Sequence, residues 1–169
     1  IENVVRRTAL FGILSIGAAF VIITSGIDLS IGSIVCLTGC MLPWLLVGQG
    51  MSPWVAMPLL VILSVGIGFA HGWFITKLKL QPFVVTLCGL LIYRGIARGY
   101  TAEATAGFPF GASYPQLEWL TIGRSYGIPH SFIAMIIIAV VMWFVLHQSV
   151  FGRHLYAVGK NDEAARFSG

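Results

Sequence analysis

The chain has 169 residues, of which 57% are hydrophobic and only 9% are charged, whereas about a quarter of the residues in a soluble domain are charged. Between Arg7 and Lys77 it carries a single charged side chain, Asp28, so a soluble fold is excluded and lipid is the expected solvent. The net charge of +4 comes from ten Lys and Arg residues that form no basic run, which argues against nucleic acid as a partner.

Five apolar segments are long enough to cross a bilayer, which takes about 20 apolar residues. They lack the strict alternation of barrel strands, so we predict helices. The fold class is therefore all-α, a polytopic transmembrane helix bundle within residues 1–148. The expected spans are residues 8–27, 31–47, 54–76, 82–99 and 131–147.

Two polar stretches lie outside these spans. Residues 100–130 form the longest connection, which we expect on the extracytoplasmic side. Residues 149–169 form a polar tail that we expect in the cytoplasm. Within the tail, Asn161 is a good N-cap and acidic residues follow it, so we predict a short helix over Asp162 to Ser168.

Asp28 lies in a polar break between the first two apolar segments. One interpretation is that its carboxylate caps a helix that begins near Leu29. The other is that the break borders a transport path, where acids inside membranes usually lie, and the two are compatible. The candidate pathway residues are Asp28, Ser30, Gly32 and Ser33.

Other chemistry is sparse. His71 stands alone in an apolar segment and is expected to be a hydrogen-bonded packing residue rather than a proton relay. Cys36 and Cys40 share a helix face, but no third ligand is near them in the sequence to complete a metal site. We predict no metal, no cofactor and no catalytic residue.

Three segments carry a resemblance to a known family. Residues 26–33 read Gly-Ile-Asp-Leu-Ser-Ile-Gly-Ser, residues 80–87 read Leu-Gln-Pro-Phe-Val-Val-Thr-Leu, and the tail reads Gly-Arg…Tyr-Ala-Val-Gly-Lys-Asn…Ala-Ala-Arg…Ser-Gly. This sequence resembles the ribose-type (simple sugar) ABC transporter permeases over nearly its whole length. One departure is Lys160, where that family often has Gly.

The resemblance implies a multi-pass permease of the bacterial inner membrane that imports a ribose-like monosaccharide. Its implied partners are two cytoplasmic ATPase subunits, a periplasmic or extracellular sugar-binding protein and a second permease subunit. The chain has no phosphate-binding Gly-rich loop, so ATP would be bound elsewhere. Because the chain begins without Met, we expect a fragment, and the resemblance implies that it corresponds to the second to sixth transmembrane helices.

The resemblance also implies that the tail couples the permease to its ATPase. The candidate coupling residues are Gly152, Arg153, Tyr156, Gly159, Asn161, Glu163, Ala164, Ala165, Ser168 and Gly169. Basic residues divide five against five between the two sides, so the positive-inside rule does not decide the orientation, and the resemblance does. An alternative function is an ion-coupled secondary transporter, since such carriers also use broken helices and intramembrane acids.

Overall fold

The computed structural model describes residues 2–101, 107–125 and 127–167. It is almost entirely helical, and five helices are long and apolar enough to cross a membrane, as predicted. They are α1 (Glu2–Ile23), α2 (Ile31–Pro43) continued by the π-helix η1 (Trp44–Gly48), α3 (Pro53–Lys77), α4 (Pro82–Thr101) and α6 (His130–Gln148). Large apolar side chains stay exposed on these helices, for example Phe69 at 75%, as expected for surfaces that face lipid.

The chain divides into two compact units. The first combines Ile1–Gly26 with Pro115–Gly169, and the second is Ile27–Tyr114.

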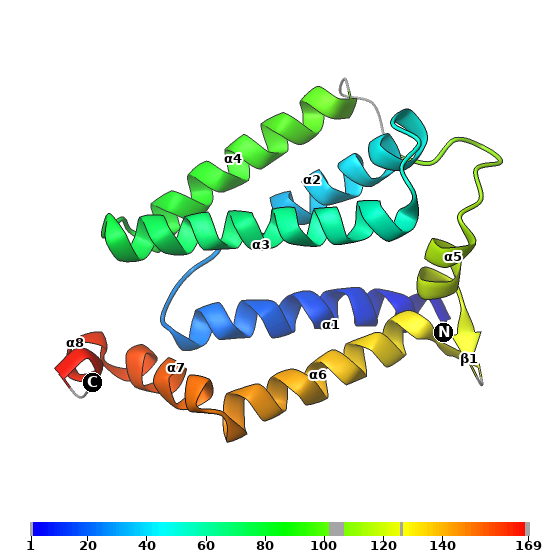
Figure 1. Cartoon of the computed structure of the whole chain (residues 1–169). Helices are drawn as coiled ribbons and strands as arrows, with labels where there is room; N and C mark the ends of the chain where they lie inside the picture. Colours follow the sequence, from blue (N-terminus) through cyan, green and yellow to red (C-terminus); the bar gives the residue numbers. More distant parts are fainter. Residues whose placement is uncertain (1, 102–106, 126, 168–169) are drawn as a thin grey trace. The chain divides into compact units, whose positions relative to one another are not determined.

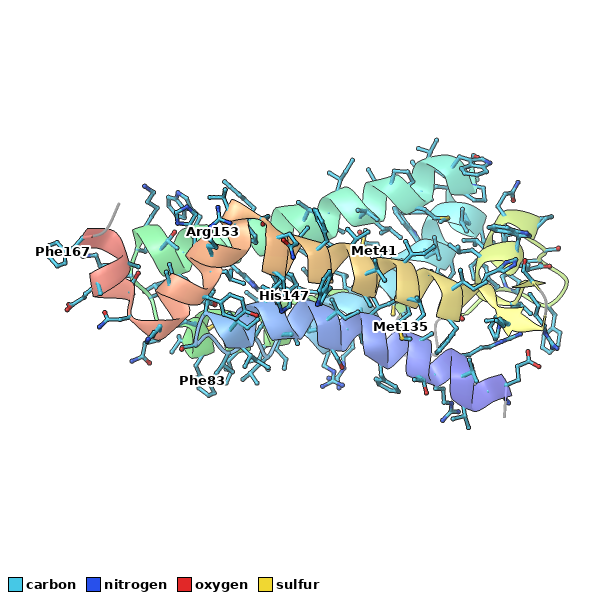
Figure 2. The ribbon with its side chains drawn as sticks, turned by 90° about the horizontal axis from the view of Figure 1, so that it is seen from below. Met41, Phe83, Met135, His147, Arg153 and Phe167 are labelled. Atoms are coloured by element: carbon cyan, nitrogen blue, oxygen red, sulfur yellow. The ribbon has the colours of Figure 1, made fainter. Side chains whose placement is uncertain are left out.

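In the first unit, α1 and α6 pack side by side along their length (Figure 1). Near the middle of α1, Met135 of α6 (Figure 2) fills the space beside Gly12, so closely that a Cβ on this glycine would overlap the Met135 sulfur. The two helices run in the same direction, because residues near the start of α1 contact the segment just before α6 and the end of α1 contacts the segment after α6.

Shorter elements stand at the two ends of this helix pair. Before α6 come α5 (Pro115–Thr121) and a small antiparallel hairpin of β1 (Arg124–Ser125) and β2 (Ile128–Pro129). After α6 come α7 (Val150–Lys160) and α8 (Asp162–Phe167).

In the second unit, α2 packs chiefly against α4, and α3 contacts both (Figure 1). The buried apolar side chains there are Leu37, Leu45, Leu46, Ala56, Leu60, Val85 and Ala97. Pro43 lies within the second span, and the helix widens after it, where the Gln49 amide donates to the Trp44 carbonyl 3.0 Å away. This five-residue spacing defines a π-turn.

The predicted boundaries need three corrections. The first span was expected at residues 8–27, but α1 begins at Glu2 and ends at Ile23. The helix starts early because the charge of Arg6 is paired with Glu2 at 2.6 Å. The helix ends early because Ser25 adopts a left-handed conformation with φ of 58°. The other four spans agree within two residues.

The second concerns residues 100–130, predicted only as the longest connection between spans, in which the structure adds α5 and the hairpin; residues 102–106 and 126 lie outside the described part. The third concerns α7, which was not predicted. Gly152 and Gly159 lower its intrinsic helix propensity, but both are places where the helix meets its neighbours closely.

Candidate functional site

The Asp28 carboxylate organises the turn that precedes α2. Its Oδ1 accepts hydrogen bonds from the Ser30 amide at 2.7 Å and from the Ser30 hydroxyl at 2.6 Å. Ser30 is fully buried, and its carbonyl accepts a hydrogen bond from Ser33 Oγ at 2.7 Å. Asp28 therefore does not cap the helix, as one interpretation had expected: α2 begins at Ile31 and not near Leu29, its N-cap residue Ser30 makes no side-chain capping bond, and Asp28 instead holds the amide of Ser30 just before the helix.

Thr86 on the first turn of α4 meets the segment that contains Asp28. Its buried Oγ1 lies 2.8 Å from the Pro82 carbonyl oxygen and 3.3 Å from the Ile27 carbonyl oxygen. Two of the three segments that carry the family resemblance are thus in contact. Of the candidate pathway residues, Ser30 and Ser33 are buried, Asp28 is half-buried and Gly32 is exposed.

His71 on α3 is a hydrogen-bonded packing residue, as predicted. It is buried, and its Nε2 lies 2.8 Å from the hydroxyl of Tyr93 on α4. Gly89 provides the space for this pair, since a Cβ there would lie 2.8 Å from the imidazole and 3.0 Å from the Tyr93 ring. No pattern in the sequence pointed to Tyr93 as its partner. In the described parts of the chain, no group of three His, Cys, Asp or Glu residues could hold a metal ion.

The connection between α6 and α7 is a tight elbow at Ser149. Its hydroxyl donates to the Val145 carbonyl and accepts from the Gly152 amide at 3.1 Å. Gly152 is buried, and a Cβ on it would overlap the carbonyl of Leu146. Gly152, a predicted coupling residue, therefore fixes the angle between the last span and the tail.

Asn161 joins α7 to α8. Its amide donates to the Ala157 carbonyl at 3.1 Å and ends α7, while its Oδ1 accepts from the Ala164 amide at 3.0 Å and starts α8. The predicted N-cap is confirmed. The predicted helix is confirmed from Asp162 to Phe167, while Ser168 and Gly169 lie outside the described residues.

The remaining predicted coupling residues lie along these two helices. Arg153, Tyr156 and Glu163 are exposed, whereas Gly159 and Ala165 are half-buried. At the end of α8, Phe167 is 92% exposed and points away from the helices (Figure 2). The two short helices α7 and α8 thus follow α6 directly, with only Ser149 and Asn161 between the helices.

An ionic cluster at the other end of the α1–α6 pair was not predicted. Glu2 pairs with Arg6 at 2.6 Å and with Arg124 at 2.7 Å, and Arg6 also donates to the Ile122 carbonyl at 3.0 Å. Close by, the buried His130 contacts the Trp119 carbonyl at 2.6 Å and the Ser125 hydroxyl at 2.8 Å. These contacts hold the α5–hairpin segment to the start of α1, at the end of the helices opposite to α7.

Comparison with known proteins identifies the family. A family model described as branched-chain amino acid transport system / permease component matches residues 1–169. The chain is similar to the ribose import permease of Escherichia coli (strain K12), with 35% identity over 167 residues that cover 99% of this chain and 52% of the relative. The ribose import permease of Bacillus subtilis (strain 168) is 37% identical over 171 residues, covering all of this chain and 52% of the relative.

A more distant relative is the xylose transport system permease of Haemophilus influenzae (strain ATCC 51907 / DSM 11121 / KW20 / Rd), 28% identical over 226 residues that cover 100% of this chain and 60% of the relative. The chain thus spans about half the length of the ribose permeases it matches. No solved structure matches it significantly.

These matches confirm the resemblance to sugar permeases noted in the sequence. Together with the five apolar helices, they make the chain part of a multi-pass protein of the bacterial inner membrane. The chain belongs to the branched-chain amino acid transport system / permease component family.

Proposed function

We propose that the chain is part of the membrane-spanning permease of an ATP-driven importer for a ribose-like monosaccharide. This proposal rests on the similarity of the chain to a ribose import permease over 99% of the chain's length. ATP would be hydrolysed on separate cytoplasmic subunits, and sugar would arrive from a binding protein. A second permease subunit would complete the channel.

We assign two different roles to the predicted pathway residues. Ser30 and Ser33 are buried and hydrogen-bonded, so we assign them to positioning Asp28. Asp28 Oδ1 is occupied by Ser30, whereas Oδ2 accepts no hydrogen bond from any described residue. We infer that Oδ2 faces the transport path, where sugar hydroxyls can donate to it.

We assign coupling to α8. The ATPase would change shape with its nucleotide, and a helix seated in a cleft of that subunit would carry this change to the membrane spans. Ala164 and Ala165 have small side chains, which allow a close approach of the helix backbone. The Ser149 elbow and the Asn161 caps fix α7 and α8 at defined angles, so a displacement of α8 would be transmitted rather than absorbed.

Copurification of the ATPase with the full-length permease tests this assignment. Ala165→Trp should abolish copurification and substrate-stimulated ATP hydrolysis, because the indole would block seating while the spans remain in the membrane. Asn161→Ala should have a smaller effect, since it removes a cap worth about 1 kcal/mol. Wild-type copurification and hydrolysis with Ala165→Trp would contradict the role of α8.

A further inference from the structure

The turn that ends α1 contains a residue in an unusual conformation. The Gly26 amide donates to the Val21 carbonyl at 3.0 Å and the Ser25 amide donates to the Ile22 carbonyl at 2.9 Å. This pair of bonds defines a Schellman motif, in which the left-handed position is usually glycine. Here that position is Ser25, with φ of 58°. A side chain in this conformation is strained, so the question is what the serine hydroxyl contributes.

The Ser25 hydroxyl reaches the last turn of α7. Its Oγ donates to the Gly159 carbonyl at 3.1 Å, across 134 residues of sequence. The carbonyls of the last helical turn have no partner inside their own helix. Asn161 satisfies that of Ala157, and Ser25 satisfies that of Gly159. A hydroxyl at the end of α1 therefore caps α7.

Gly159 is matched to this contact by its lack of a side chain. A Cβ on Gly159 would overlap the Ile23 carbonyl and would lie 3.4 Å from the Cα of Thr24. The backbones of α1 and α7 meet directly here. Gly152, two turns earlier in α7, meets α6 in the same way, so the two glycines seat α7 against both spans of its unit.

From this joint the chain leads directly to the candidate transport path, because only Gly26 and Ile27 separate Ser25 from Asp28. We propose that Ser25 and Gly159 form a mechanical joint through which displacement of α7 and α8 repositions the Asp28 segment. The inference rests on the proposed function and deepens it. Both are positioning residues, since they contact each other and would act on the Asp28 segment only through the backbone.

The decisive variant is Ser25→Gly, which removes the hydroxyl while placing the residue best suited to the left-handed turn. The variant should therefore fold and assemble as well as the wild type. The full-length permease would be reconstituted in proteoliposomes with its ATPase and binding protein, and labelled ribose taken up would be measured against ATP hydrolysed. We expect ribose transported per ATP to fall roughly fivefold, the factor that one ordinary hydrogen bond contributes to an equilibrium.

Two further variants test the mechanism. Ser25→Asn should retain more coupling than Ser25→Gly, because asparagine tolerates the left-handed conformation and its amide can donate to the Gly159 carbonyl. Gly159→Ala should reduce coupling, because the added methyl group forces α7 away from α1. The matched controls are Thr24→Val, whose lost hydrogen bond to Val21 only joins the turn after α1 to the end of that helix, and Gly17→Ala, where a Cβ meets nothing within 4 Å. Both should couple normally.

The outcomes separate the joint from the proposed function. A Ser25→Gly complex that transports ribose with the wild-type yield per ATP overturns the joint and leaves the proposed function standing. A Ser25→Gly permease that no longer binds the ATPase also overturns it, because the residue would then act in assembly. A wild-type complex without ATP-dependent ribose uptake overturns the proposed function itself.

Discussion

The hydroxyl of Tyr93 lies 2.8 Å from Nε2 of His71, and this contact joins α4 to α3. Polar contacts between membrane helices stabilise a bundle by about 0.6–2 kcal/mol each. Because the two rings meet over Gly89, the pair depends on a glycine as well as on its own hydrogen bond. Each part of this arrangement can be tested separately.

Tyr93→Phe should lower the stability of the purified permease by about 1 kcal/mol, because it leaves the buried His71 nitrogen without its partner. Thermal unfolding in detergent would measure the loss. Tyr100→Phe is the matched control, since its ring contact with Trp44 at 5.2 Å does not need the hydroxyl. Equal losses in both variants would show that the His71 contact contributes nothing particular.

Gly89→Ala should destabilise the permease by about 1–3 kcal/mol, the usual range for overfilling a packed site. The new methyl group would lie 2.8 Å from the His71 ring, so α3 and α4 would have to separate. Gly95→Ala on the same helix is the control, because a Cβ there meets nothing within 4 Å. Unfolding curves of the two variants should differ, and superimposable curves would refute the close packing at Gly89.

A cysteine at Ser113 should react with an impermeant thiol reagent added outside intact spheroplasts. Ser113 lies between α4 and α5 and is exposed, on the connection that we propose faces the binding protein. The three native cysteines would first be replaced. A cysteine at the exposed Lys160 on α7 is the opposite control, which should react only after permeabilisation. Reversal of the two patterns would invert the proposed topology.

Asp28→Ala should impair transport more than it impairs folding. Loss of the two Oδ1 hydrogen bonds to Ser30 should cost about 1–3 kcal/mol, which the packed helices should tolerate. Asp28→Asn keeps an Oδ1 acceptor for Ser30 and removes the charge, so it should fold normally. A transport defect in this variant would therefore come from the lost charge and not from a disturbed turn. If Asp28→Ala assembles with its ATPase and transports at the wild-type rate, Asp28 is structural only.

The extent of the apolar helices could be predicted from the sequence, because composition alone determines which segments prefer lipid. Four spans were predicted within two residues, and the N-cap at Asn161 was recognised from local side-chain chemistry. The start of α1 was missed because Arg6 looks unfavourable in a span until its pairing with Glu2 is known. For α7, propensity was misleading, since Gly152 and Gly159 are placed for contacts with other elements.

The contacts within the candidate site could not be predicted. Thr86 meets Ile27 across 59 residues, Tyr93 meets His71 across 22 and Ser25 meets Gly159 across 134. Neither propensity nor periodicity specifies such pairs, because each depends on how helices that look alike in composition pack together. Of these three pairs, only Thr86 and Ile27 both lie in segments that carry the family resemblance, and the resemblance did not indicate their contact.

Uptake of labelled ribose into proteoliposomes tests the central claim most directly. The vesicles would contain the full-length permease with its ATPase, with ATP on the ATPase side and the binding protein with ribose on the other. Uptake should require ATP and the ATPase, and it should persist when ionophores collapse proton and sodium gradients. Uptake that proceeds without ATP and stops with the ionophores would contradict this account and identify an ion-coupled secondary transporter instead.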